Sequence, residues 1–416
     1  MKALQNNMTE KGQLRINVIE DQLNIPIEDA KIDISFTGEP DSVIEEVQTD
    51  SSGTSEVLDL AAPPESYSER PGEIEPYAEY TIRVQAEGFE PITIGGTEVF
   101  SGQLALQTVR MRPLEAGQSP DVVVIPVHTL FGNYPPKIAE AEIKPVNQSG
   151  EIVLSRVVVP EFIVVHDGVP TDPTAGDYYV RYRDYIKNVA SSEIYATWPR
   201  DTLEANILAI MSFTLNRVYT EWYRNKGYNF TITSSTAFDH KWIYQRNIFE
   251  SISEVVDDLF DNYLSRPNVK QPILTQYCDG NRVLCPNWMS QWGSKDLGEQ
   301  GYSSIEILRY YYGDNMYINS AEEVAGIPVS WPGYNLTIGS YGDAVQQIQE
   351  QLNTIAGSYP LIPVIVADGI YGRNTENAVR TFQRIFNLTP DGIVGRRTWN
   401  RIQDIYVGVT RIAELY

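Results

Sequence analysis

Residues 367–383 and 390–403 read ADGIYGRNTENAVRTFQ and PDGIVGRRTWNRIQ, which are two copies of one pattern, DGIxGxxTxxxI/V. In each copy the Asp-Gly pair predicts a tight turn, and the second glycine allows a close backbone approach. The threonine can cap a helix that buries the following Val or Ile. Together with GDAVQQIQEQLN at 342–353, the copies predict a small unit of three helices over residues 331–416.

This repeat resembles the type 1 peptidoglycan-binding domain, because several motif elements of that domain coincide here. The resemblance implies that residues 331–416 bind bacterial cell wall. Peptidoglycan is then the expected partner of the chain, and the expected substrate of whatever precedes the repeat. A purely structural helical repeat is the alternative interpretation.

The length of 416 residues predicts two to four domains. The net charge of −23 and a pI near 4.5 argue against a nucleic-acid partner. No apolar run reaches the ~18 residues of a membrane span. The start, MKALQNNMTEKGQ, lacks the apolar core of a secretory signal. We therefore expect a protein that is cytosolic or is moved outward by a route that the sequence does not show.

The first segment, residues 1–112, is rich in short alternating stretches such as LRINVIE and AKIDISF, separated by turn clusters such as DSSGTS. This spacing predicts a β-sandwich. PIEDAKIDI, TDSSGT and YTIRVQAEGFEP resemble the prealbumin-like sandwiches of carboxypeptidase regulatory-like and collagen-adhesin B-type domains. The segment holds no convincing catalytic cluster, so we expect a structural or interaction module. PLEAGQSPD at 113–121 then predicts an exposed linker.

Residues 122–330 mix predicted strands (VVVIPV, EIVLSRVVVP, FIVVHDG) with predicted helices (TLEANILAIMSFTLNRVYTEWY, IFESISEVVDDLFDNYL, SSIEILRYYY). This mixture indicates an α+β domain. The stretch after Trp198 predicts a long amphipathic helix, with Pro199 early in it and the acids Asp201 and Glu204 in its first turn.

The side chains needed for amide cleavage do not form a recognisable pattern. The three histidines are far apart in the sequence, with no HExxH. The only cysteines, Cys278 and Cys285, have no histidine nearby and can form a disulfide, remain thiols or supply half of a zinc site. Amidase or peptidase chemistry therefore has little support from the residues.

Glycan cleavage needs only carboxylates, and a lytic transglycosylase can use a single one. That acid protonates the glycosidic oxygen, and its carboxylate then helps to deprotonate the sugar's own C6 hydroxyl. Apolar surroundings favour such an acid because they raise its pKa. Glu193, within YIKNVASSEIYATW at 185–198, has a suitable local composition. By composition alone, an ordinary capping or surface glutamate is the better interpretation.

YIKNVASSEIYATWPRDTLEANILAIMSFTLNRVY resembles the catalytic motif of the family of stage II sporulation protein D and the LytB-type amidase enhancers. The family's catalytic Glu corresponds to Glu193, its Pro to Pro199 and its Leu-Glu-Ala to residues 203–205. The resemblance therefore implies that Glu193 is the acid/base. That family often ligates zinc with a His and two Cys, but the CxxxxxxC here lacks the matching histidine. We expect no metal and no cofactor.

The order of the three parts resembles the family of clostridial spore cortex-lytic enzymes. This implies a germination enzyme in the spore, made in the mother cell without a secretory signal, that cleaves cortex peptidoglycan containing muramic-δ-lactam. It also implies a proenzyme that a subtilisin-like germination protease activates. We expect that cut between about Leu114 and Val124, near Gln118, in the linker, with the sandwich as inhibitor.

Other polar and aromatic residues near these motifs are candidates for binding the glycan: Tyr195, Thr236, Asp239, His240, Gln276, Tyr277, Gln291 and Trp292. Each has a structural alternative, since aromatic residues are frequent core members. Two other functions also remain open. One is a bifunctional enzyme with N-acetylmuramoyl-L-alanine amidase activity, and the other is a non-catalytic enhancer that binds wall without cutting it.

Overall fold

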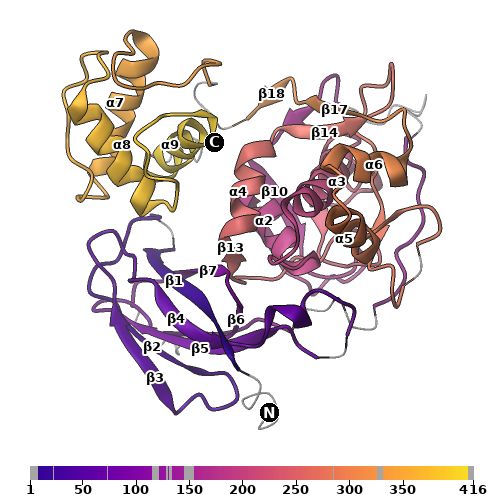
Figure 1. Ribbon diagram of the computed structural model, residues 1–416, viewed down its shortest axis with the longest axis horizontal. Coiled ribbons are helices and arrows are strands. Elements are labelled where there is room, and N and C mark those ends of the chain that lie inside the picture. The colour runs from indigo at the N-terminus through magenta and orange to yellow at the C-terminus, as the bar shows by residue number, and fades with distance from the viewer. Residues whose placement is uncertain are drawn as a thin grey trace.

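The computed structural model describes residues 8–21, 23–72, 74–114, 121–127, 130, 134–144, 154–283, 285–325 and 331–410. The chain is a multidomain protein with mixed sheets and a carboxy-terminal helical domain (Figure 1). In that view the amino-terminal strands lie at lower left, the central part at right, and the carboxy-terminal helices at upper left. Within the described ranges, no helix is both long and apolar enough to cross a membrane.

The amino-terminal strands belong to two sheets, with the orders β3-β2-β5-β6-β8 and β13-β7-β1-β4. The alternation of LRINVIE holds: Leu14, Ile16 and Val18 of β1 are fully buried, and the residues between them are not. The strands of this part are β1 (Glu10–Glu20), β2 (Lys31–Phe36), β3 (Val43–Gln48), β4 (Leu58–Ala62), β5 (Tyr77–Gln85), β6 (Ile92–Phe100), β7 (Leu104–Met111) and β8 (Asp121–Val124).

Two strands from beyond residue 112 complete these sheets. β8 pairs in parallel with β6, and β13 (Ile248–Phe249) pairs antiparallel with β7. The structure thus differs from the predicted boundary at residue 122, because β8, which includes the three valines of VVVIP, is an edge strand of the first part. The apolar residues of both parts also form one continuous core, so the first two parts are packed as a unit. Most of the predicted linker, residues 115–120, lies outside the described residues.

The central part is built of helices around four small sheets, with the orders β11-β10-β12, β14-β17, β15-β16 and β18-β9. Its helices are α2 (Tyr182–Glu193), α3 (Arg200–Tyr219), α4 (Glu250–Leu259), α5 (Gln291–Glu299) and α6 (Ser304–Tyr312). Its remaining strands are β9 (Val158–Val159), β10 (Phe162–His166), β11 (Asp177–Arg181), β12 (Ile232–Thr233), β14 (Asn262–Ser265), β15 (Tyr277–Cys278), β16 (Met289–Ser290), β17 (Tyr317–Ser320) and β18 (Glu323–Val324).

The helix predicted after Trp198 exists, but it is not amphipathic. α3 is buried over almost its whole length and contacts α2, α4, α5 and α6. Pro199 is the residue that precedes its first turn, and Asp201 lies in that turn. Because the helix lies at the centre of this part, it supports the segments that surround it.

The carboxy-terminal domain has a core of its own, built by α7 (Asp343–Ala356), α8 (Arg373–Ile385) and α9 (Arg396–Thr410). Three helices were predicted for this domain, and the prediction is confirmed. Gly369 and Gly392 have φ values of +72° and +71°, so each Asp-Gly pair makes a turn that favours glycine.

A buried glutamine holds each of these turns. The Oε1 of Gln349 accepts a hydrogen bond from the backbone N–H of Gly369 (2.8 Å), and its Nε2 donates to Asp368, Ile370 and Thr375. The second copy repeats every one of these bonds through Gln383, Gly392, Asp391, Ile393 and Thr398. The two copies are therefore equivalent in three dimensions as well as in sequence.

Two details of the repeat differ from the prediction. Thr375 is the third residue of α8 and not its cap, and its hydroxyl accepts the bond from Gln349. A Cβ on Gly372 would have no heavy atom within 4 Å, so this glycine does not serve a close backbone approach.

Candidate active site

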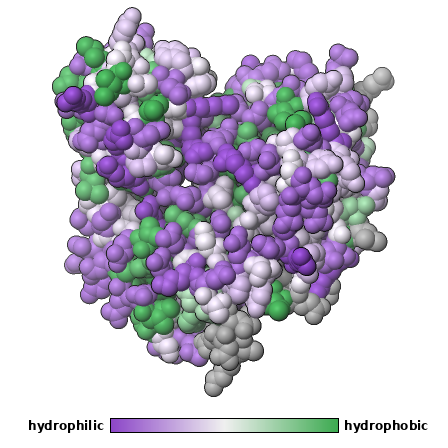
Figure 2. All heavy atoms as spheres, in the orientation of Figure 1, coloured by the Kyte–Doolittle hydropathy of each residue, from purple (hydrophilic) through white to green (hydrophobic). Residues whose placement is uncertain are grey.

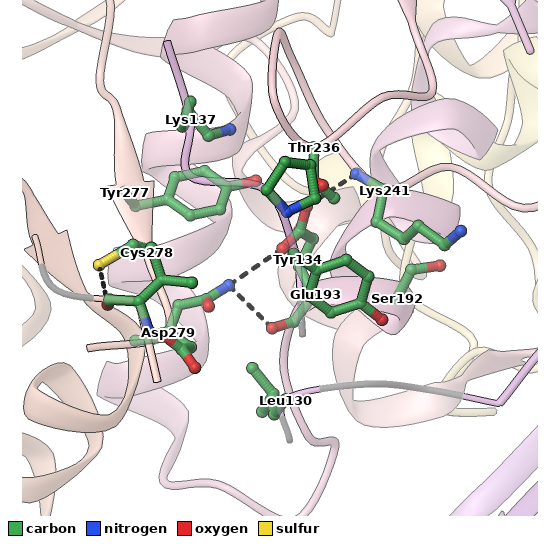
Figure 3. Close-up of a pocket in the computed structure, with 13 residues that line it drawn as sticks. Leu130, Tyr134, Lys137, Ser192, Glu193, Thr236, Lys241, Tyr277, Cys278 and Asp279 are labelled. Carbon is green, nitrogen blue, oxygen red and sulfur yellow. Dashed lines mark hydrogen bonds between the residues drawn. The ribbon is translucent and has the colours of Figure 1, made fainter. Parts of the chain in front are cut away.

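Glu193 is the last residue of α2, and its carboxylate points into a pocket (Figure 3). One oxygen, Oε1, accepts a hydrogen bond from the backbone N–H of Lys241 (2.7 Å). The other, Oε2, accepts from Nε2 of Gln291 (3.2 Å), which also donates to the Glu193 carbonyl (2.8 Å). Since Gln291 begins α5, two elements distant in sequence fix the direction of one acid.

The pocket is open to solvent, and its empty space of about 530 Å³ includes part of that solvent. Its residues come from α2, β15 and the first residue of α5, from the loops before β13 and after β15, and from the segment before residue 144. They are Leu130, Tyr134, Pro135, Lys137, Ser192, Glu193, Thr236, Lys241, Tyr277, Cys278, Asp279, Val283 and Gln291. Among the lining residues that the structure describes, none comes from the sheets of the first part.

Cationic and aromatic groups surround the acid. Burial lowers the pKa of Lys137 to about 8, although the negative charge of Glu193 acts in the opposite direction. Burial also lowers the pKa of Lys241, with Asp167 and then Glu193 opposing the shift. The pKa of Tyr277 is raised well above its usual range, first by burial and then by the charge of Glu193. The Tyr277 hydroxyl therefore remains a neutral hydrogen-bonding group beside the acid.

Asp279 is the second carboxylate of the pocket, and its oxygens are already engaged. Oδ1 accepts from the backbone N–H of Val283 (2.8 Å) and Oδ2 from that of Arg282 (3.1 Å). These bonds form a turn at the pocket edge. Asp279 thus holds this turn, whereas the Glu193 carboxylate lies at the end of α2 and faces the pocket.

The disulfide between Cys278 and Cys285 closes a loop beside the pocket, with its Cα atoms 5.7 Å apart. Of the three states that the sequence left open, the structure shows this one. Among the residues that the structure describes, no group of three or more His, Cys, Asp or Glu could hold a metal ion.

Three of the predicted glycan-binding residues, Thr236, Tyr277 and Gln291, line the pocket. The prediction differs from the structure for two others, Tyr195 and Trp292. Both are buried in the core, where their rings pack against each other (5.9 Å between centroids). They stabilise the end of α2 from behind and do not face a ligand.

The predicted glycan-binding role also differs from the structure for Asp239, His240 and Gln276. Asp239 is fully buried and binds the guanidinium of Arg217 (2.7 Å). His240 is enclosed by the core, and burial holds its pKa well below its usual range. Gln276 is buried and bonds to the backbone of Ile138 and Glu140. All three support the pocket walls without reaching the cavity.

Sequence reasoning missed the wall formed by residues 134–144. Gln276 holds this segment through its backbone, and the buried Arg217 binds the carboxylate of Glu140 (2.6 Å). The segment brings Tyr134 and Lys137 beside Glu193. No motif marks these residues, which stand more than fifty positions before Glu193; a lysine and a tyrosine in a proline-rich stretch were the only signals.

Comparison with known proteins identifies the last domain. The family described as peptidoglycan binding domain matches residues 341–402. The chain is similar to a zinc D-Ala-D-Ala carboxypeptidase of Streptomyces albus G, with 36% identity over 76 residues, 18% of this chain and 28% of that protein. The chain thus spans less than a third of that relative's length. The peptidoglycan-binding domain predicted at the carboxy terminus is confirmed.

Two solved structures also show local likeness. The first is the SleB N-terminal domain, with 26% identity, 18% of this chain and 99% of that chain covered, and a TM-score of 0.17. The second is GBS52, the minor pilin of Streptococcus agalactiae, with 10% identity, 27% and 48% covered, and a TM-score of 0.18.

Proposed function

We propose that this protein cleaves the glycan backbone of peptidoglycan as a lytic transglycosylase, with Glu193 as its single acid and base. The observation that carries the proposal is the position of Glu193 in the pocket, held by Lys241 and Gln291, with the neighbouring Asp279 engaged in a turn. The peptidoglycan-binding domain of the same chain supplies the substrate class.

The reaction needs one proton to move twice. Glu193 first donates a proton to the glycosidic oxygen, and the bond between that oxygen and C1 of the muramoyl residue breaks. The Glu193 carboxylate then takes the proton of the C6 hydroxyl of the same residue, whose oxygen bonds to C1 and forms a 1,6-anhydro ring. Between the two steps, the Lys241 N–H and the Lys137 ammonium stabilise the carboxylate.

An aromatic cluster follows Lys241 in the sequence and suits contact with the glycan beyond the pocket. Lys241, which donates to Glu193, is followed by Trp242, whose ring packs against Tyr178 (5.3 Å). Tyr178 in turn packs against Tyr244 (4.8 Å), which is partly exposed. A sugar ring can stack on an exposed aromatic face, so Tyr244 extends the site beyond the pocket, while the rings of Tyr178 and Trp242 support it.

The finer identification follows from the motif around Glu193 and from the order of the three parts. We infer a spore cortex-lytic enzyme with a sporulation-D-like catalytic part and a prealbumin-like sandwich before it. Its substrate is then cortex peptidoglycan containing muramic-δ-lactam. It is made as a proenzyme, and a subtilisin-like germination protease activates it.

Replacing the acid tests the proposal. Glu193→Gln removes the transferable proton and keeps the shape of the side chain, so we expect the cutting rate to fall by at least about 10³-fold. Folding and wall binding should be unchanged. Mass spectrometry of digested wall should show 1,6-anhydro-muramic ends with the parent chain and none with the variant.

The same spectra separate the other functions. Free stem peptides would identify an amidase, and no released fragments from the parent chain would identify a non-catalytic enhancer. Reducing muramic ends would indicate a hydrolase that uses water, with Asp279 as its second carboxylate. Substantial anhydro product from Glu193→Gln would contradict the assignment of Glu193 as the acid.

A further inference from the structure

The two copies of the DGIxG repeat have different surroundings, and the second is covered. α9 begins with Arg396 and Arg397, and both bind acids of the central part. Arg397 binds Glu254 (3.0 Å) and Asp258 (2.7 Å), which are four residues apart on one face of α4. Arg396 binds Asp261. This end of the second copy is thus a surface that binds carboxylates.

The first copy presents the corresponding surface to solvent. α8 begins with Arg373, the counterpart of Arg396, which is exposed and forms no ion pair within the described part of the chain. The acids closest to it in sequence have other partners. Glu376 pairs with Arg380 (2.8 Å), and Oδ1 of Asp368 accepts from the backbone N–H of Ile370 (2.9 Å). The Arg373 guanidinium is therefore available to a ligand.

Large exposed apolar side chains occur in the same domain, and Ile370 stands three residues before this arginine in the sequence. Tyr341 is 82% exposed, Val364 76%, Val366 75% and Ile370 59%. Tyr341 and Ile370 are bridge partners, and Val364 and Val366 point outward on either side of Ile365, which packs against the domain core. Figure 2 shows hydrophobic side chains gathered on this lobe, at upper left. Ile393, the counterpart of Ile370, is half-buried.

We propose that this open face, formed by Tyr341, Val364, Val366, Ile370 and Arg373, is where the domain binds peptidoglycan. Arg373 binds a carboxylate of a stem peptide, and the apolar residues cover the sugar rings and methyl groups beside it. Charge complementarity supports this occupant, because Arg396, at the same position in the second copy, binds the carboxylate of Asp261. The inference deepens the wall-binding part of the proposed function and does not depend on Glu193.

The two equivalent copies therefore have different roles in the proposal. The second copy attaches the domain to α4, and the first remains free for the wall. A duplicated unit thus provides one surface for the rest of the chain and one for the substrate.

Binding can be measured without cutting if the full chain carries Glu193→Gln. In a pelleting experiment with purified sacculi, we expect Arg373→Glu, and separately Tyr341→Ser with Val366→Ser, to raise Kd at least tenfold. Arg384→Glu makes the same charge change at the far end of α8, where the side chain is also exposed. Tyr310→Ser removes a comparably exposed tyrosine from α6. Both controls should bind like the parent.

A second probe identifies the source of the carboxylate. The second probe is glycan strands whose stem peptides have been removed. The parent should bind these strands weakly, with a Kd similar to that of the Arg373→Glu variant on intact sacculi. On these strands Arg373→Glu should have no further effect, whereas Tyr341→Ser with Val366→Ser should still weaken binding. Equal weakening by Arg373→Glu on both probes would overturn the stem-peptide contact. Parent-like pelleting of both open-face variants would overturn the open face itself.

These outcomes can be read whether or not Glu193 is the acid, because pelleting requires no cleavage. Thermal unfolding of each variant confirms that its fold is intact. The substituted side chains are exposed, so we expect melting temperatures close to that of the parent.

Discussion

Lys137 is a cation in an environment that disfavours its charge. Its ammonium lies over the rings of Tyr277 (4.6 Å) and Phe213 (5.1 Å) and donates to the carbonyl of Asp239. Burial lowers its pKa to about 8, even though Glu193 and Asp239 favour the charged form. The protonation of Lys137 therefore changes in the weakly alkaline range, around its pKa of about 8.

This pKa predicts an alkaline limb in the activity. Below pH 8 the Lys137 ammonium stabilises the carboxylate that remains when Glu193 has donated its proton, and above pH 8 that charge is lost. We expect the rate of anhydro-product release to fall as the pH rises through about 8. Lys137→Arg keeps its charge throughout, so its rate should not fall there. Initial rates of the parent and of Lys137→Arg between pH 6 and 10 measure this difference.

Lys137→Met gives the complementary control. Without a cation, the variant should be slow on both sides of pH 8. At neutral pH its rate should be roughly tenfold below that of the parent, which corresponds to about 1.4 kcal/mol in activation free energy. An alkaline fall in Lys137→Arg that matches the parent would show that another group titrates in this range.

At the residue scale, the sequence predicted the acid and misplaced most of its neighbours. Glu193 was found because its motif is contiguous, and its catalytic role stays a prediction. His240 and Trp292 are polar or aromatic residues next to pocket residues, but adjacent side chains on a loop or helix point in different directions. Lys137 reaches the pocket through a distant segment, which no local pattern reveals.

At the scale of elements, α3 shows why a polar residue can mislead. The sequence predicted an amphipathic helix, and the polar residues at 206, 212 and 216 are ones that such a helix would expose. In the structure they bind buried groups instead: Asn206 to Ser294 (2.8 Å), and Asn216 to the Pro272 carbonyl (2.7 Å). Hydropathy cannot distinguish such a helix from an exposed one, because the partners come from other elements.

The repeat shows the opposite case, in which local sequence was sufficient. Its turns need glycine at a positive φ and are close to the helices they join, so the pattern predicted the three helices correctly. The equivalent glutamines were missed, since they lie 19 and 8 residues before the aspartates they bind.

These glutamines give a prediction at the same scale. Gln349→Ala leaves a buried backbone N–H at Gly369 and the Thr375 hydroxyl without their partner, which costs about 1–3 kcal/mol. We expect amides of α7 and α8 in the full chain to exchange hydrogen roughly 5- to 150-fold faster. Hydrogen exchange followed by mass spectrometry measures this. Gln346→Ala is the matched control, because Gln346 is exposed on the same helix.

Gln383→Ala should have a similar effect in the second copy, where the same bonds recur. Unchanged exchange in both variants would mean that the turns hold without their glutamines, and would contradict the role assigned to this network.

At the scale of the whole molecule, buried contacts join the first part to the central part. The guanidinium of Arg246 binds Glu98 of β6 (2.6 Å), and both side chains are fully buried. Arg246 also donates to Ser192 (3.1 Å), the residue before the proposed acid, and Asn247 bonds twice to the backbone of Glu98. Removing one partner of this pair while the parts stay together would leave an uncompensated buried charge, which costs about 3–5 kcal/mol.

These contacts change what proteolysis in the linker should do. A cut near Gln118 falls outside the described residues, but it separates β8 from β6 in the chain while their pairing, and that of β13 with β7, persists. We expect both fragments to co-elute at the mass of the intact protein on size exclusion and to part only in denaturant. Activation by such a cut would then proceed without release of the amino-terminal part.

A chain beginning at Val122 should fold poorly, since Arg246 lacks Glu98 and β8 lacks β6. Glu98→Ala in the cut protein should promote dissociation, and Glu87→Ala, which removes an exposed carboxylate of the same part, should not. Two separate peaks from the cut parent under native conditions would show that the first part is a removable domain, as the sequence alone suggested.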